Sequence, residues 1–189
     1  MTAWDLPSSL CVGGQEWSIR TDFRAVLDIL KYFNDPEYEE DEKWEICLDI
    51  LYENFSDMPP ELWKEAAQKA IEFIDMGIRD DGKKRPKIMD WEQDAPIIAT
   101  AVNNVIGGEI RSPRPTHWWT FLGAYMEIGE SLFSQVLNIR NKKKKGEKLE
   151  KWEQKFYAEN RALIDLRSKK SERSEEEKEA IRKVFGIKG

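Results

Sequence analysis

The sequence contains few of the side chains on which metal sites, disulfide frameworks and histidine-based catalysis depend. Its 189 residues include two cysteines and a single histidine. Cys11 and Cys47 form neither a CxxC pair nor a zinc-type spacing, so we expect two reduced, partly buried thiols rather than a disulfide framework. We therefore predict no metal site and no cofactor.

Long apolar runs are also missing. No window approaches the roughly 20 consecutive apolar residues that a membrane-spanning helix needs. The first ten residues, MTAWDLPSSL, lack the basic-then-apolar order of a signal peptide. We therefore expect a cytoplasmic protein with no membrane partner. With 40% hydrophobic residues, the chain is long enough to bury one sizeable core.

The charges are distributed unevenly along the chain. Residues 1–140 carry 14 Lys or Arg against 26 Asp or Glu, a net charge of −12, whereas residues 141–189 carry 16 against 10, a net charge of +6. We predict an acidic helical core domain over residues 1–140 and a basic, charged helical extension over residues 141–189. The extension could contact nucleic acid or an acidic partner, although a charge run is more often a solvated surface.

Apolar periodicity predicts a mainly α fold, a helical bundle of about five to six helices preceded by a short N-terminal β-hairpin. Leu10 and Val12 alternate with polar residues before Gly13–Gly14, and the alternation resumes at Trp17. Two adjacent glycines supply the positive φ angles that a tight hairpin turn requires. Residues 1–20 are therefore expected to hold two short antiparallel strands.

Three helices are expected between the hairpin and residue 77. Thr21 is a candidate N-cap for the first, which should stop near Asn34. The acidic run at residues 37–42 has no calcium-loop spacing, so we interpret it as a solvated linker that leads into an acidic helix start. The second helix carries one apolar stripe, Trp44, Cys47, Leu48, Leu51 and Phe55. The third should begin at Pro59–Pro60 and close at Gly77.

A fourth helix starts at either Asp90 or Asp94. Pro96 lies harmlessly in the first turn if the helix begins at Asp94, but it removes a hydrogen bond and bends the axis if the helix begins at Asp90. In the second case the two carboxylates share a face. Such a pair could be catalytic or metal-binding, yet capping and ion pairing are favoured because no further ligand or nucleophile follows by spacing.

The segment 116–140, THWWTFLGAYMEIGESLFSQVLNIR, reads as one helix capped by Thr116. Apolar residues cover two of its faces, so we expect neighbours on both sides and a central place in the core. His117 stands in the first turn, where a neutral imidazole can bond to backbone or to a carboxylate. Because no serine or cysteine nucleophile motif accompanies it, we favour a structural or capping role and expect no enzyme.

Beyond a basic break at residues 141–148, two amphipathic segments follow. The first is expected to be one helix marked by Leu149, Trp152, Phe156, Leu163 and Leu166. The second starts with a capping-box pattern at residues 174–177 and is short enough to need something to pack on. We hypothesise that residues 147–185 bind a partner through their apolar side chains, namely Trp152, Phe156, Leu163, Ile181, Val184 and Phe185.

Several motifs occur in an order that resembles a known family. They are an LP…V.G..W.I.TDFR element near the N-terminus, a central D…D…I, HWW.F after a turn, and a final IR. Over roughly residues 6–140 this order resembles a family of small tail-morphogenesis, tail-assembly-chaperone-like proteins of long-tailed phages and prophages of Gram-positive bacteria. The motif residues are Asp22, Phe23, Arg24, Asp90, Asp94, His117, Trp118, Trp119, Phe121 and Arg140.

The resemblance implies a largely helical, non-enzymatic protein that acts in the host cytoplasm before the tail is complete. The expected partner is the tape-measure protein, a long helical chain that must stay soluble while tube subunits assemble around it. The tail-tube protein is a second candidate partner, and a homo-oligomer is compatible with the family. No catalytic residues accompany the resemblance.

Two other functions stay open. A structural component of the phage tail would share the same family and gene context. A nucleic-acid-binding protein would use the basic run Lys142–Lys145, and its affinity would fall steeply with salt. We expect a protein partner rather than nucleic acid, because most charge runs form a solvated surface.

Overall fold

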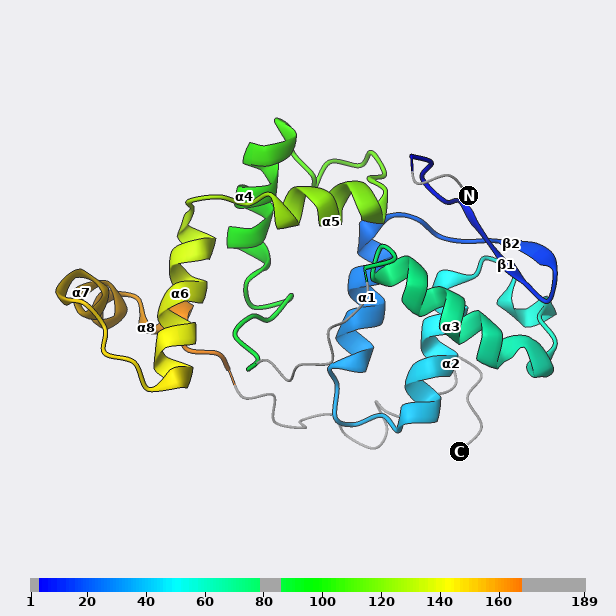
Figure 1. Ribbon diagram of the computed structural model, residues 1–189, viewed down its shortest axis with the longest axis horizontal. Coiled ribbons are helices and arrows are strands. Elements are labelled where there is room, and N and C mark those ends of the chain that lie inside the picture. Colours follow the sequence, from blue (N-terminus) through cyan, green and yellow to red (C-terminus); the bar gives the residue numbers. More distant parts are fainter. Residues whose placement is uncertain (1–3, 79–85, 168–189) are drawn as a thin grey trace. The chain divides into compact units, whose positions relative to one another are not determined.

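The computed structural model describes residues 4–78 and 86–167 (Figure 1). Within these ranges it contains one two-stranded sheet, eight α-helices and two 3-10 helices. The predicted mainly α fold with an N-terminal hairpin is confirmed, with more helices than expected because two predicted helices are each divided. Residues 4–78 and 116–119 form one compact unit, and residues 86–115 and 120–167 form a second.

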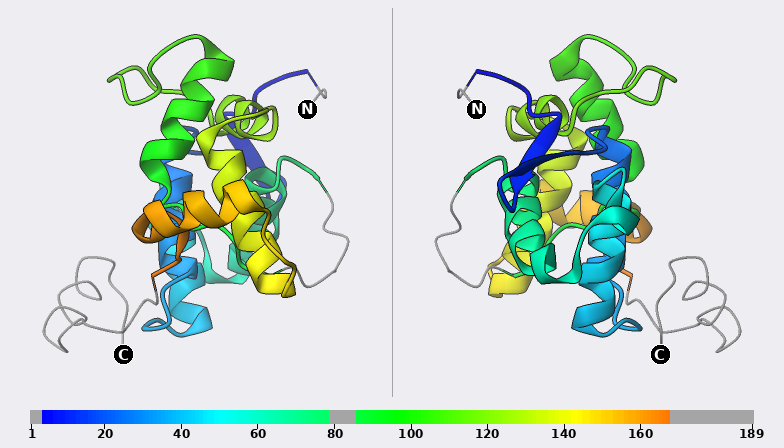
Figure 2. Two further views of the ribbon diagram at one scale, coloured as in Figure 1. Left: turned by 90° about the vertical axis from the view of Figure 1, so that its left-hand side faces the viewer. Right: turned by 90° about the vertical axis from the view of Figure 1, so that its right-hand side faces the viewer.

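The hairpin opens the first unit. Strands β1 (Ser9–Val12) and β2 (Gln15–Ser18) pair antiparallel, with Leu10 opposite Trp17. Both turn glycines have positive φ, 59° at Gly13 and 75° at Gly14, as the predicted tight turn requires. A Cβ on Gly13 would also lie 2.8 Å from the Leu62 side chain. The hairpin lies beside helix α3 (Figures 1 and 2).

Helices α1 (Phe23–Phe33) and α2 (Glu40–Leu51) pack against each other in the same unit. The N-cap of α1 is Asp22, which accepts a hydrogen bond from the Arg24 N–H, so the predicted cap at Thr21 is one residue too early. A carboxylate is at least as good a cap as a hydroxyl at this position. The acidic run does lead into a helix start, since α2 begins with a Glu39–Glu42 capping box.

After α2 the chain turns through the 3-10 helices η1 (Phe55–Asp57) and η2 (Pro60–Leu62) into α3 (Trp63–Ile74). The predicted third helix is therefore confirmed, although its first turn is 3-10 and Phe55 lies in η1 rather than in α2. The buried Tyr52 hydroxyl donates to the carbonyl of Ala66 at 3.0 Å and links the end of α2 to α3.

Helix α4 (Ala95–Ile106) begins the helical part of the second unit. Its N-cap is Asp94, so Pro96 falls in the first turn and removes no intrahelical hydrogen bond. This decides between the two starting points that the sequence left open. The helix ends at Gly107, whose φ of 74° is the left-handed conformation common at helix ends.

The expected single helix over residues 116–140 is wrong, because the segment contains α5 (Trp118–Met126) and then α6 (Leu132–Lys145). The interruption has a clear cause. The Ser131 hydroxyl accepts from the Ser134 N–H, and the Ser134 hydroxyl accepts from the Ser131 N–H. This reciprocal cap starts a new helix at residue 132.

The described part of the C-terminal extension contains α7 (Lys151–Glu159) and the single-turn α8 (Arg161–Ile164), where one helix was expected. A buried cluster of Val136, Ile139 and Ile164 joins α6 to α8. The domain boundary expected at residue 140 falls inside α6, which continues to Lys145. Across residues 4–78 and 86–167, no helix is long and apolar enough to cross a membrane.

Candidate functional site

The TDFR and HWW motifs meet in the first unit. Asp22 and His117 form an isolated antiparallel bridge, in which the Phe23 N–H donates to the Thr116 carbonyl and the Trp118 N–H donates to the Thr21 carbonyl. The Asp22 carboxylate also accepts from the Thr116 N–H at 2.9 Å and from the Arg24 guanidinium at 3.0 Å. This carboxylate therefore links two segments that are distant in the sequence.

His117 uses both ring nitrogens on backbone groups. Its Nδ1 accepts from the Trp119 N–H at 3.0 Å, and its Nε2 lies 3.0 Å from the Pro7 carbonyl oxygen, which fits the Nε2–H tautomer. The ring packs edge-on against Phe73. The imidazole thus caps the start of α5, the kind of role that its place in the first turn predicted.

The two tryptophans of HWW close the end of α3. The Trp118 indole N–H donates to the Ile74 carbonyl and the Trp119 indole N–H donates to the Phe73 carbonyl, both at 2.8 Å. Carbonyls in the last turn of a helix lack a full set of intrahelical partners, so these indoles satisfy groups that would otherwise need water. Trp118 and Phe121 are buried, as expected of core residues.

The D…D and IR motifs meet in the second unit as a buried ion pair. Arg140 and Asp94 form two hydrogen bonds of 2.6 and 2.8 Å, and their side chains are 4% and 0% exposed. Arg140 also donates to the carbonyls of Ile88, Leu163 and Ile164. All five N–H donors of the guanidinium are therefore used, which is what a buried charge requires.

Asp90 has a separate, local role. Its carboxylate accepts from the N–H groups of Glu92 and Gln93 and pairs with Lys87 at 3.3 Å. Burial acts to raise the pKa of Asp90, but the hydrogen bonds from Gln93 and Lys87 outweigh it and lower that pKa. The interpretation of Asp90 and Asp94 as capping and ion-pairing groups is confirmed by these contacts.

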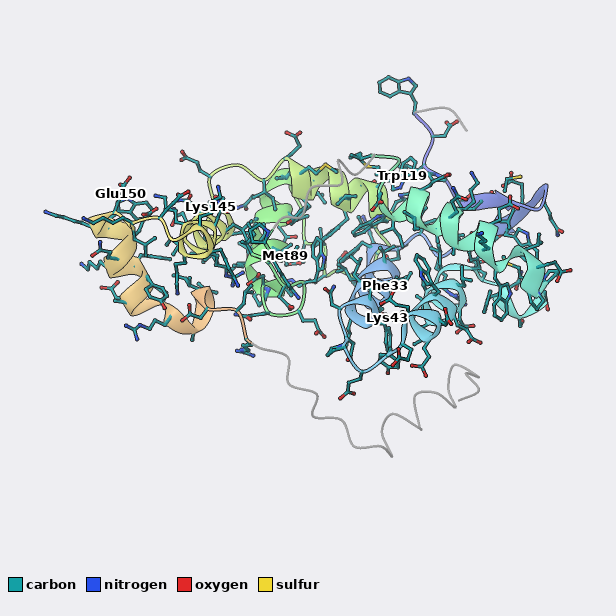
Figure 3. The ribbon with its side chains drawn as sticks, turned by 60° about the horizontal axis from the view of Figure 1, so that its bottom comes forward. Phe33, Lys43, Met89, Trp119, Lys145 and Glu150 are labelled. Atoms are coloured by element: carbon teal, nitrogen blue, oxygen red, sulfur yellow. The ribbon has the colours of Figure 1, made fainter. Side chains whose placement is uncertain are left out.

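Most of the basic run at the end of α6 is already paired. Lys142 contacts the buried Glu153 at 2.6 Å, Lys143 contacts Asp165 at 2.5 Å, and Lys145 reaches Glu147 at 4.0 Å. Lys143 also lies 3.6 Å above the Tyr157 ring. Figure 3 shows Lys145 and Glu150, which stand at the two ends of the α6–α7 connection. Three of these four lysines thus have acidic partners within their own unit.

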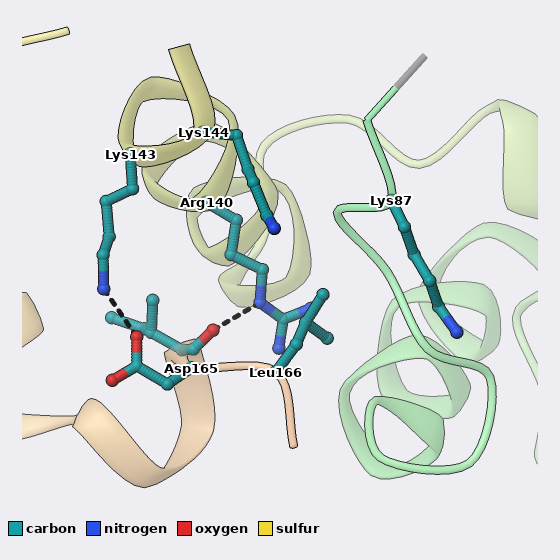
Figure 4. Close-up of a pocket in the computed structure, with 7 residues that line it drawn as sticks. Lys87, Arg140, Lys143, Lys144, Asp165 and Leu166 are labelled. Atoms are coloured by element: carbon teal, nitrogen blue, oxygen red, sulfur yellow. Dashed lines mark hydrogen bonds and ion pairs between the residues drawn. The ribbon is translucent and has the colours of Figure 1, made fainter. Parts of the chain in front are cut away.

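A pocket of about 390 Å³ opens beside this run, within the second unit (Figure 4). Lys143 and Lys144 reach it from α6, and Lys87 reaches it from the segment before α4. Its remaining lining residues are Arg140, Ile164, Asp165 and Leu166. Local sequence patterns do not predict this pocket. Lys144 belongs to the basic run at residues 142–145, but Lys87 is far from it in the chain and no motif connects the two.

The apolar residues proposed to bind a partner have different environments. Phe156 and Leu163 pack on the cluster of Val136, Ile139 and Ile164 and are partly buried. Trp152 is 50% exposed, and its indole N–H donates to Glu150. The other three members of the set, Ile181, Val184 and Phe185, lie outside the described residues.

Residues 4–78 and 86–167 contain two free cysteines and no group of side chains that could hold a metal ion. In these ranges no three His, Cys, Asp or Glu side chains are grouped so as to hold a metal ion. Both cysteines are free, Cys11 at the surface and Cys47 in the core. Burial raises the pKa of Cys47 to about 12, so its thiol stays protonated and unreactive at neutral pH.

These observations define a small, mainly α protein whose motif residues serve its architecture, and whose accessible features include a basic pocket and a half-exposed tryptophan. Residues 4–166 match the family model described as Bacteriophage Gp15 protein, and the chain belongs to that family. It is therefore a phage protein, and the family points to a structural or morphogenesis role. No curated protein and no solved structure matched the chain.

Proposed function

We propose that this protein is a phage tail-morphogenesis factor without catalytic activity, a tail-assembly chaperone that binds the tape-measure protein in the host cytoplasm. The binding keeps the tape-measure chain soluble while the tail tube assembles around it. The observation that carries the proposal is the family match over residues 4–166, which includes the TDFR and HWW.F motifs and the described part of the basic extension.

The second unit offers surface for such a partner. Val105, Ile106, Met126, Leu132 and Trp152 are each at least 40% exposed there. Exposed aliphatic and aromatic side chains on helices are the contacts that amphipathic helical partners use. Because α7 is anchored through Phe156 on the α6–α8 cluster, Trp152 projects from a supported helix rather than from a free end.

Co-expression with the phage's tape-measure protein tests the proposal. We expect a soluble complex on affinity capture, with a defined stoichiometry by size exclusion with light scattering. Tape-measure protein expressed alone should be largely insoluble. Co-expression with the tail-tube protein under the same conditions examines the second candidate partner. A monodisperse chain that leaves the tape-measure protein insoluble would contradict the chaperone role.

A structural component of the tail is the alternative that the same family match supports. Mass spectrometry of purified virions separates the two roles, because a chaperone is released before the particle is complete and a structural component is retained. The ion pairs made by Lys142, Lys143 and Lys145 speak against a nucleic-acid role for the basic run, since paired lysines release fewer counterions on binding phosphate.

A further inference from the structure

We propose that the pocket between the end of α6 and the segment before α4 binds an acidic peptide segment, with one carboxylate between Lys87 and Lys144 and an aliphatic side chain against Ile164 and Leu166. The inference rests on the proposed function, because it names the chemistry of the partner segment that this protein would hold. The pocket lies wholly within the second unit.

Two of the four cations in the pocket are already neutralised. The Arg140 guanidinium has all its donors on Asp94 and three carbonyls, so it forms a fixed floor. Lys143 is held by Asp165, whose carboxylate also accepts from the Tyr157 hydroxyl at 3.0 Å. The one carboxylate in the lining is thus balanced by Lys143.

The two remaining cations are Lys87 and Lys144. Among the described residues, Lys144 is the member of the basic run that has no carboxylate partner. Lys87 is half exposed and contacts Asp90 at 3.3 Å. The Asp90 carboxylate also accepts from the N–H groups of Glu92 and Gln93, so it keeps two donors when Lys87 turns to a ligand carboxylate. Figure 4 shows Lys144 beside Arg140 on α6 and Lys87 on the separate segment before α4.

The rest of the lining favours peptide over nucleic acid. Ile164 and Leu166 offer aliphatic contact, and none of the lining residues is an aromatic on which a base could stack. A nucleic-acid strand also needs a series of free cations along its backbone, whereas most of the adjacent lysines are paired. A pocket of about 390 Å³ suits one or two side chains of a peptide.

In the test, the full-length protein is titrated into each of two fluorescein-labelled probes. Binding is measured by fluorescence anisotropy at low and at physiological salt. The first probe is a short peptide in which Glu and Leu alternate, and its analogue carries Gln in place of Glu. The second probe is a short oligothymidine. The pocket variant is Lys87→Gln with Lys144→Gln. The matched control, Lys148→Gln with Lys155→Gln, removes the same charge at two exposed lysines outside the pocket.

We expect the Glu-Leu peptide to bind the natural chain and to bind the pocket variant about tenfold more weakly, since the variant loses two exposed ion pairs to the peptide carboxylate. The control variant should keep the affinity, and the Gln analogue should bind poorly. Circular dichroism checks that both variants keep the natural helix content.

Four results would each overturn the inference. The first two are no binding of the Glu-Leu peptide, and a loss of its affinity that is equal in the pocket and control variants. The third is a Gln analogue that binds as tightly as the Glu-Leu peptide, and the last is a pocket variant that loses affinity for the oligothymidine only. The last would reassign the pocket to nucleic acid. Co-expression and affinity capture with the tape-measure protein test the proposed function independently of the pocket. If the pocket variant still solubilises the tape-measure protein as well as the natural chain does, the proposed function stands and the pocket is not its binding site.

Discussion

The buried Arg140–Asp94 pair makes the second unit sensitive to the loss of either charge. Arg140→Ala leaves a carboxylate without its partner in the interior, and we expect a loss of about 3 to 5 kcal/mol in the free energy of unfolding, measured in urea. Asp94→Leu combined with Arg140→Met should recover part of this loss, because it removes both charges but leaves the carbonyls that Arg140 donates to without their donor.

The matched control for that prediction is Arg111→Ala. Arg111 pairs with Glu109 at 2.6 Å, but both side chains are exposed, so the change should shift the urea midpoint little. If Arg140→Ala behaved like Arg111→Ala, the buried pair would contribute nothing to the stability of the second unit.

Sequence reasoning singled out both members of this pair but did not join them. Arg140 and Asp94 stand 46 positions apart, and no local pattern connects them. One signal was present, since Arg140 follows Val136 by four positions on the apolar side of its helix. A charged group at such a position requires a buried partner of opposite charge. Which Asp or Glu becomes the partner of Arg140 depends on tertiary packing, which no local sequence pattern shows.

The cysteines should differ sharply in reactivity. Cys11 is exposed, whereas Cys47 is buried and burial raises its pKa to about 12. Iodoacetamide at neutral pH, followed by peptide mass spectrometry, should label Cys11 alone in the folded protein and both cysteines in urea. A Cys11→Ser variant provides the control, and rapid labelling of its remaining thiol under native conditions would contradict the burial of Cys47.

At the level of elements, the local signals predicted helix ends better than helix continuity. Asn34 and Pro96 occupy end positions in the structure because their constraints act within one turn of backbone. The break between α5 and α6 was missed because Ile128 and Leu132 continue the helical apolar spacing across it. A serine pair is a weaker sequence signal than the usual Ser-Glu capping box.

The Ser131–Ser134 cap is open to direct measurement. Ser131→Ala removes the acceptor for the Ser134 N–H, and we expect it to lower the free energy of unfolding by about 1 kcal/mol. Ser8→Ala, at an exposed position outside any helix, is the comparison and should leave the urea midpoint unchanged. Equal midpoints for the two variants would show that the cap does not stabilise α6.

At the level of the whole molecule, the described part of the basic extension is part of the folded second unit. A truncation after residue 140 removes Ile164 from the buried cluster and two of the carbonyls that satisfy Arg140. We expect it to unfold much of the second unit, seen as a loss of helix signal in circular dichroism. A truncation after residue 167 keeps every one of these contacts and should leave the second unit folded, seen as a cooperative urea transition.

Acid should weaken the same unit. The hydrogen bond from Lys142 lowers the pKa of Glu153, and the one from Lys143 lowers the pKa of Asp165. Their ordinary values are 4.5 and 3.8. Because both folded values lie lower, the stabilisation is complete above about pH 5 and is lost as the pH falls through the folded values.

Urea midpoints between about pH 7 and about pH 3 measure this dependence. Lys142→Gln should flatten the curve, because the Glu153 carboxylate then loses the partner that lowers its pKa. Lys148→Gln, which removes the same charge from an exposed position, should leave the curve unchanged. Identical curves for these two variants would show that the Lys142–Glu153 pair does not cause the acid sensitivity.

The Arg140–Asp94 pair also has an evolutionary consequence. Its two positions lie in α6 and at the start of α4, and each is tolerable in the interior only while the other is present. Among related phages, a lineage that replaces one of them must replace the other at nearly the same time or lose the fold of the second unit. In an alignment of the family, the residues at positions 94 and 140 should therefore covary.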